Sequence, residues 1–131
     1  DTLAMALTER CRVVAVDVAG RGHSDWLADP MAYQVPTYVA DLAALMRHLR
    51  DQNPGVRIDW VGTSMGGLIG LGLAGTPELP LPAPVRRLVL NDVGPAIRPE
   101  AVQRIGAYKS AGDQLLVDDQ IRICQPQSQL G

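Results

Sequence analysis

The sequence is poor in the features that mark several classes of protein. Its 131 residues include only two cysteines, Cys11 and Cys124, which lie far apart and outside any metal-ligand spacing. They do not predict the disulfide framework of a small secreted domain, and we expect two reduced, buried thiols. No apolar run approaches the length of a membrane span. Lys and Arg number 12 against 14 Asp and Glu, so the charge favours neither a nucleic acid nor a membrane surface as partner.

The first residues also lack a targeting signal. They have neither the basic flank nor the apolar length of a signal peptide, so we expect a cytoplasmic protein. The chain opens at Asp1 without an initiator methionine, in what looks like the end of a helix. We therefore interpret it as a fragment, with room for one domain.

Apolar runs and turn residues divide the chain into alternating strands and helices. Runs rich in β-branched residues predict strands at 12–16, 56–61 and 85–90. Helical patterns cover residues 3–9, 38–50, 65–75 and 99–108. Gly and Pro predict loops at 18–36 and 76–84. This alternation predicts a parallel sheet covered on both faces, with Asp17, Ser64 and Asp92 at one edge of it.

Two helices carry further local signals. Thr37 is the expected N-cap of the 38–50 helix. The apolar stripe of that helix is Val39, Leu42, Leu45, Met46 and Leu49. The helix at 65–75 contains Gly66, Gly67, Gly70 and Gly72. Because interior glycine destabilises a helix, we expect these glycines to permit close approach to a neighbouring strand.

Residues 62–66, Gly-Thr-Ser-Met-Gly, form the pattern G-x-S-x-G between a predicted strand and a predicted helix. This pattern is typical of a nucleophile elbow, a sharp turn that exposes a serine hydroxyl. Ser64 would lie at a helix N-terminus, where free N–H groups favour negative charge. The N–H of Met65 would point at a developing oxyanion. The alternative interpretation is a Gly/Ser turn without chemistry.

Three segments together resemble the α/β-hydrolase superfamily. Residues 12–26 are similar to its strand followed by D-x-x-G-x-G-x-S, residues 59–67 (D-W-V-G-T-S-M-G-G) to its elbow, and residues 87–95 (R-L-V-L-N-D-V-G-P) to its next strand. The resemblance covers about residues 3–108. It is greatest to bacterial hydrolases of the meta-cleavage-product, esterase and lactonase kind.

The resemblance implies a fold class and roles for individual residues. The three strands match the fourth to sixth of an eight-stranded sheet, which implies an incomplete parallel-sheet α/β-hydrolase core. Ser64 matches the nucleophile and the N–H of Met65 the second oxyanion donor. The loop formed by Asp17, Gly20, Gly22 and Ser24 matches one that is structural in the family. A small-molecule substrate is implied as partner, and no metal or organic cofactor.

The rest of the catalytic machinery is not evident. The family's triad runs Ser, acid, His along the chain, whereas His23 and His48 both precede Ser64. We expect neither histidine to act as a general base. Asp92 is a candidate acid, although most relatives place theirs after a later strand and a turn-forming role is favoured at this position. Asp113, Asp118 and Asp119 lie where the resemblance ends.

The family's third strand, which lies between its fourth and fifth, has no counterpart here. We therefore expect no ladder between 12–16 and 57–61, whereas 57–61 and 86–90 should pair. Unpaired strand edges favour aggregation. We expect residues 1–131 either to fold poorly or to bring the first two strands together.

The domain division follows from the same match. Residues 1–108 are predicted to be a partial hydrolase domain, and residues 109–131 a divergent or poorly ordered tail. The tail is irregular apart from short apolar stretches at 115–117 and 121–123. A truncated or altered reading frame would explain it, and so would a divergent terminus.

The sequence thus predicts a serine-nucleophile hydrolase of a carboxylic ester or related carbonyl substrate. In C–C bond hydrolases the same groups act on a ketone. Because loss of a triad member leaves only residual catalysis, we expect little activity from this chain alone. The alternative is a non-catalytic α/β segment or interaction module that keeps the elbow for packing.

Overall fold

The computed structural model describes residues 2–77, 79, 81, 84–94, 96 and 121–126. The helices are α1 (Thr2–Leu7), α2 (Val35–Gln52) and α3 (Met65–Gly75), with a 3-10 turn at Pro30–Ala32. The strands are β1 (Cys11–Val16), β2 (Ile58–Thr63), β3 (Val85–Asn91) and β4 (Ile121–Pro126). The predicted helix at 99–108 lies outside the described residues, as do Asp113, Asp118 and Asp119.

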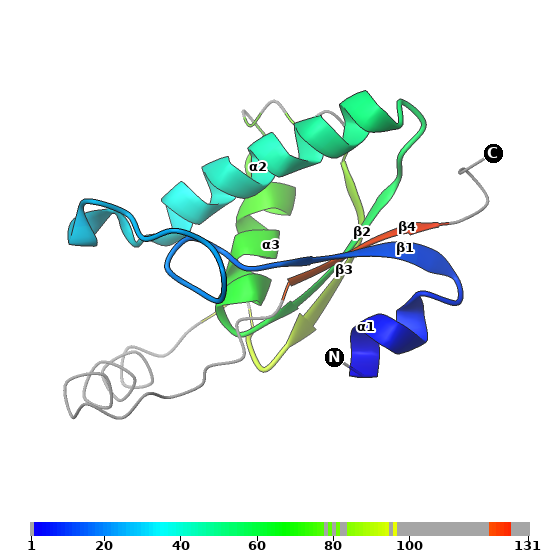
Figure 1. Cartoon of the computed structure of the whole chain (residues 1–131), viewed down its shortest axis with the longest axis horizontal. Helices are drawn as coiled ribbons and strands as arrows, with labels where there is room; N and C mark the ends of the chain where they lie inside the picture. The colour runs from blue at the N-terminus through cyan, green and yellow to red at the C-terminus, as the bar shows by residue number, and fades with distance from the viewer. Residues whose placement is uncertain are drawn as a thin grey trace.

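The four strands form one sheet in the order β1-β4-β2-β3 (Figure 1). β2 and β3 are parallel, and β4 is antiparallel to both β1 and β2. The sheet is therefore mixed, and the prediction of a parallel sheet was wrong in this respect. β1, β2 and β3 still run in one direction, so their carboxyl ends meet at one edge as expected.

β4 is the element that the sequence analysis did not anticipate. It lies between β1 and β2, so these two strands have no mutual ladder, as predicted, but they do not come together either. The alternation of residues 121–124, Ile-Arg-Ile-Cys, directs both isoleucines to one face of the sheet. Ile121 and Ile123 are each 0% exposed. The apolar stretch at 121–123 was evident in the sequence but was not assigned to a strand, whereas its two isoleucines complete the core.

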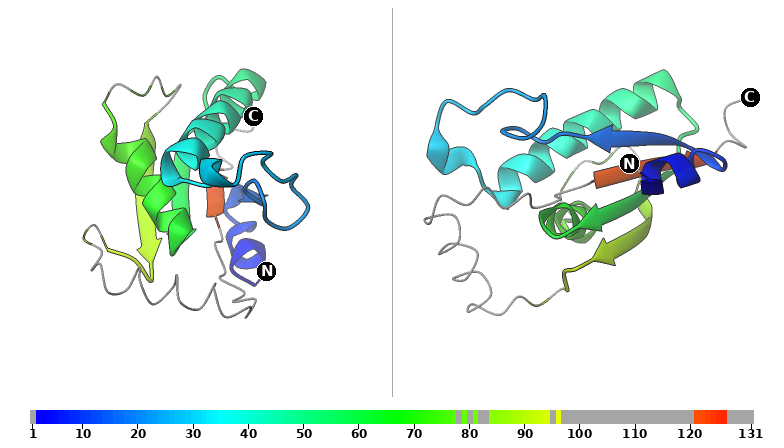
Figure 2. Two further views of the ribbon diagram at one scale, coloured as in Figure 1. Left: turned by 90° about the vertical axis from the view of Figure 1, so that its left-hand side faces the viewer. Right: turned by 60° about the horizontal axis from the view of Figure 1, so that its bottom comes forward.

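The helical face of the sheet carries the main core. Ile121 and Ile123 pack there with residues of β2, α2 and α3, including Trp60, Met46 and Ile69. Figure 2 shows α2 and α3 together, apart from α1. The Sγ of Cys11 donates a hydrogen bond to the carbonyl of Leu7, which places α1 against β1. Cys11 and Cys124 are both buried and free, as expected.

α2 begins earlier than predicted. Gln34 is its N-cap and Pro36 lies in its first turn, so Thr37 is not the cap. Proline is tolerated there because the first N–H groups of a helix have no intrahelical acceptor. The predicted apolar stripe was correct, with Val39, Leu42, Met46 and Leu49 buried and Leu45 packed against the core.

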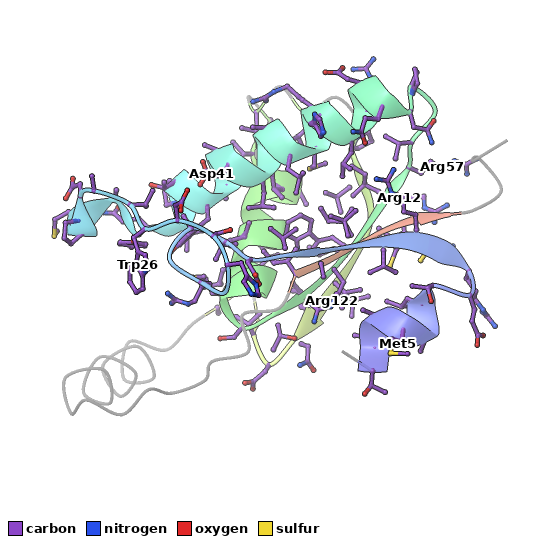
Figure 3. The ribbon with its side chains drawn as sticks, in the orientation of Figure 1. Met5, Arg12, Trp26, Asp41, Arg57 and Arg122 are labelled. Atoms are coloured by element: carbon purple, nitrogen blue, oxygen red, sulfur yellow. The ribbon has the colours of Figure 1, made fainter. Side chains whose placement is uncertain are left out.

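Two arginines of the sheet have pKa values that are shifted in opposite directions. Arg86 of β3 donates two hydrogen bonds to the carboxylate of Asp59 on β2, and these raise the pKa of Arg86. Arg122 of β4 is buried, and burial lowers the pKa of its guanidinium (Figure 3).

Within the part of the chain that the structure describes, no helix is both long and apolar enough to cross a membrane.

Candidate functional site

Ser64 lies on a strained turn between β2 and α3. Its φ is 52° and its ψ is −117°, a backbone conformation that is uncommon for a residue with a side chain. Its N–H donates to the carbonyl of Asn91 at 2.9 Å, which extends the ladder between β2 and β3. Its carbonyl accepts from the N–H groups of Gly67 and Leu68 at 3.0 and 3.2 Å, which starts α3. Backbone hydrogen bonds to β3 and to α3 thus fix the position of Ser64.

The small residues on either side of Ser64 allow this turn to close. A Cβ on Gly62 would collide with backbone atoms of Gly66 and Gly67. The strand that precedes the serine and the helix that follows it therefore approach too closely for any side chain. The indole Nε1 of Trp60 also donates to the carbonyl of Gly66 at 3.0 Å in the core.

Gly70 and Gly72 of α3 permit close contacts with two different neighbours. A Cβ on Gly70 would lie 2.6 Å from Trp60 Nε1 and 2.7 Å from Leu88 Cδ1, so the predicted close approach to strands is correct there. A Cβ on Gly72 would lie 2.7 Å from Val39 Cγ2, so this glycine permits contact with α2 instead. The α3 helix is thereby fixed against both the sheet and its neighbouring helix.

Met65 is the first residue of α3 and its side chain packs against the core. The first N–H groups of a helix have no intrahelical acceptor and carry partial positive charge. The backbone N–H of Met65 is therefore placed at the N-terminus that follows Ser64. The role of this N–H as an oxyanion donor stays a prediction.

Asp92 follows β3 as Ser64 follows β2. Thr63 and Asn91 are partners in the parallel ladder, and Asn91 Nδ2 donates to Thr63 Oγ1 at 3.3 Å. Asp92 is exposed and has a φ of 57°. This left-handed conformation is one that Asp adopts in turns, which supports the turn-forming interpretation. Asp92 directly follows Asn91, whose carbonyl accepts the N–H of Ser64, and its role as an acid stays a prediction.

Each histidine contacts a side chain other than that of Ser64. The Nδ1 of His23 lies 3.5 Å from the Asp17 carboxylate, and its ring is fully exposed. The Nε2 of His48 lies 3.0 Å from Gln52 Nε2 on the exposed side of α2. Within the described residues, neither histidine is hydrogen-bonded to Ser64.

The loop after β1 is organised around Asp17. The carboxylate of Asp17 accepts the N–H of His23 at 3.0 Å, and its carbonyl accepts the hydroxyl of Ser24 at 2.6 Å. Gly20 and Gly22 have φ values of 77° and 51°. A Cβ on Gly22 would collide with the Asp17 carboxyl group. These contacts support a structural role for the loop.

A cavity of about 330 Å³ lies at the end of β1, between this loop and the first half of α2. Its walls include Asp17, Trp26, Asp41 and Leu45, and none of residues 62–66 lines it. Trp26 and Asp41 lie on the loop and on α2, respectively (Figure 3). Trp26 is 80% exposed, with its ring edge-on to Tyr33. Trp26 therefore borders a cavity that is separate from the elbow.

Sequence reasoning missed two residues that support the elbow. Trp60 lies two positions before Gly62, and its indole reaches across to α3. Asn91 joins β3 to both Thr63 and Ser64. Both residues lie within segments that resemble the family, but their hydrogen-bond partners depend on how separate elements pack together.

Among the described residues, no group of three His, Cys, Asp or Glu is placed to hold a metal ion.

Comparison with known proteins identifies similar sequences. The family model described as alpha/beta hydrolase fold matches residues 2–116. A 3-hydroxybutyrate-oligomer hydrolase from Cupriavidus necator (strain ATCC 17699) is 56% identical over 108 residues. That match covers 82% of this chain and 34% of the relative, so the chain spans about a third of the relative's length. No solved structure gives a significant match.

Proposed function

Because the chain belongs to the alpha/beta hydrolase fold family, we propose that it is a serine-nucleophile ester hydrolase segment in which Ser64 attacks the substrate. The conformation of Ser64 carries this proposal. A non-glycine residue at φ 52° and ψ −117° is strained, and such strain is typical of functional sites. A Cβ on Gly62 would collide with the backbone of Gly66, so this turn requires a glycine at position 62.

The proposed reaction is acyl transfer in two steps. The Oγ of Ser64 adds to the ester carbonyl, and a general base takes the hydroxyl proton. The carbonyl oxygen becomes an oxyanion that the backbone N–H of Met65 stabilises. Collapse of this tetrahedral intermediate expels the alcohol, which takes up the proton held by the base, and leaves an acyl-serine. Water then hydrolyses the acyl-serine to the carboxylic acid and regenerates the Ser64 hydroxyl. Asp92 is the candidate acid that would orient the base.

The substrate class that we propose is a carboxylic ester. The Cupriavidus necator relative is named for 3-hydroxybutyrate oligomers, whose units are joined by ester bonds. Those oligomers are therefore the first substrates to test for this chain.

Neither His23 nor His48 is hydrogen-bonded to Ser64 within the described residues. For this reason we propose that the 131-residue chain turns over esters slowly by itself.

Covalent labelling tests the nucleophile. The chain is incubated with a fluorophosphonate, and peptide mass spectrometry locates the adduct, while circular dichroism verifies the fold. We expect slow labelling at Ser64, loss of the adduct in Ser64→Ala, and retention in Ser24→Ala. Equal labelling of Ser64→Ala would contradict the proposal, as would the absence of an adduct from both this folded chain and a longer chain that contains it. That result would favour the alternative in which the elbow serves packing alone.

A further inference from the structure

The two cysteines lie on neighbouring antiparallel strands. Val13 of β1 is opposite Cys124 of β4, and Cys11 is opposite Pro126. Because side chains alternate along a strand, Cys11, Val13 and Cys124 share one face of the sheet. Cys11 is thus a diagonal neighbour of Cys124. Diagonal neighbours have Cα atoms about 7–8 Å apart, with the Cβ atoms closer.

Both thiols are buried against the elements that surround them. Cys11 is 7% exposed and Cys124 is 5% exposed. The thiol of Cys11 donates a hydrogen bond to the carbonyl of Leu7 in α1, and its proximity contributes to the raised pKa of the Cys124 thiol. Disulfides usually join Cα atoms about 4.4–6.8 Å apart, so bond formation needs β1 and β4 to approach each other by about 1 Å in addition to side-chain rotation.

We propose that Cys11 and Cys124 are an oxidative modification site, at which an intramolecular disulfide joins β1 to β4. The oxidant is a low-molecular-weight disulfide such as oxidised glutathione. The family match ends at residue 116, so Cys11 lies inside the matched region and β4 lies beyond it. The bond would link β4 covalently to the region that the family model matches.

The chemistry is thiol–disulfide exchange in two steps. One cysteine thiolate attacks a sulfur of oxidised glutathione, expels a glutathione thiolate and forms a mixed disulfide. The second cysteine thiolate attacks the protein sulfur of that mixed disulfide and expels the second glutathione thiolate. The two cysteines lose two protons and two electrons, and oxidised glutathione becomes two molecules of reduced glutathione.

The disulfide should form during folding rather than afterwards. Burial, with the neighbouring Cys11 thiol, raises the pKa of Cys124 to about 12. The thiolate is the reactive form, so the folded, reduced protein reacts slowly. In an unfolded chain both thiols are accessible. Pairing of β1 with β4 then brings the sulfur atoms together as the strands align.

The test compares two routes to oxidation. The full chain is refolded in a mixture of reduced and oxidised glutathione, and the already folded, reduced chain is placed in the same mixture. We expect the refolded chain to lose two hydrogens in mass and to yield one cross-linked peptide that contains Cys11 and Cys124. We expect the folded chain to react at least about tenfold more slowly.

Matched variants test the register. Cys11→Val combined with Val13→Cys places the thiol directly opposite Cys124, and we expect it to cross-link. Cys11→Val combined with Arg12→Cys places the thiol on the other face, and we expect no cross-link. Circular dichroism verifies that each variant folds.

Three results would overturn the proposal. One is a refolded chain that keeps both thiols or carries only glutathione adducts. Another is cross-linking between molecules instead of within one. The third is equal cross-linking of the Arg12→Cys variant, which would show random collision in the unfolded chain instead of strand pairing.

Discussion

The indole Nε1 of Trp60 donates a buried hydrogen bond to the carbonyl oxygen of Gly66 across 3.0 Å. Trp60 belongs to β2 and Gly66 to the first turn of α3, so this bond crosses the sharp turn at Ser64. The close contact between Gly62 and Gly66 holds the same turn. The conformation of Ser64 thus depends on the core beneath it as well as on the local motif.

Trp60→Phe should destabilise the protein. The substitution removes the hydrogen bond to Gly66 and part of a side chain that is 0% exposed. We expect the free energy of unfolding to fall by about 1–3 kcal/mol in urea titrations. Trp26→Phe is the matched control, because Trp26 is 80% exposed and its loss should change stability by about 0.5 kcal/mol or less. Equal effects of the two substitutions would contradict the role of Trp60.

Gly62→Ala should disrupt the elbow. The added methyl group would collide with the backbone of Gly66, which cannot move without displacing α3. We expect a loss of about 2 kcal/mol or more in the free energy of unfolding. Gly75→Ala should be neutral or stabilising by up to about 1 kcal/mol, because the new Cβ would meet no atom within 4 Å beyond its chain neighbours and the adjacent helix backbone. Chemical denaturation of both variants measures the difference.

Strain at Ser64 predicts a difference between two substitutions. Ser64→Ala keeps a Cβ at φ 52°, whereas Ser64→Gly removes it and relieves the strain. We expect the glycine variant to be more stable than the alanine variant by about 1 kcal/mol. Thermal unfolding of the two variants under one condition provides the measurement. A less stable glycine variant would argue against stored strain.

Ile123→Ala tests the contribution of β4 to the core. Ile123 is 0% exposed and lies opposite Val14 on one side and Trp60 on the other. We expect a loss of about 2–5 kcal/mol in the free energy of unfolding. Val89→Ala is the control, because Val89 is 52% exposed and should lose much less. If Ile123→Ala had no larger effect than Val89→Ala, β4 would not be docked as described.

The Cys124 thiol should make stability depend on alkaline pH. Burial raises its pKa from 9.0 to about 12. Below pH 9 the thiol stays protonated in the folded and the unfolded chain. Between these two values the unfolded chain releases the proton while the folded chain keeps it, so stability falls as the pH rises. Under reducing conditions, we expect Cys124→Ala to lose part of the decline in the urea midpoint between pH 8 and pH 10.

The elements that local pattern specifies were predicted well. The apolar stripe of α2, the bounds of α3 and the parallel pairing of β2 with β3 all agree with the sequence analysis. Each depends on residues close together in the chain or on a recognised βαβ unit. The predicted start of α2 was wrong because proline is typical of loops, whereas Pro36 fits the first turn of the helix.

The prediction of the candidate site was similarly uneven. The position of Ser64 at a strand-to-helix turn follows from the glycines around it. The supports from Trp60 and Asn91 could not be predicted, since each bond joins separate elements. The roles of Ser64, Met65 and Asp92 in hydrolysis stay predictions. The labelling experiment addresses the first of them directly.

The elbow and the family could be predicted from the sequence, because G-x-S-x-G and its flanking apolar runs act through neighbouring residues. What lies between β1 and β2 depends on tertiary packing. There β4 pairs antiparallel with both strands and buries Ile121 and Ile123. Strand pairing joins residues from opposite ends of the chain. A six-residue alternating segment shows which of its faces is apolar but not which strands it will join.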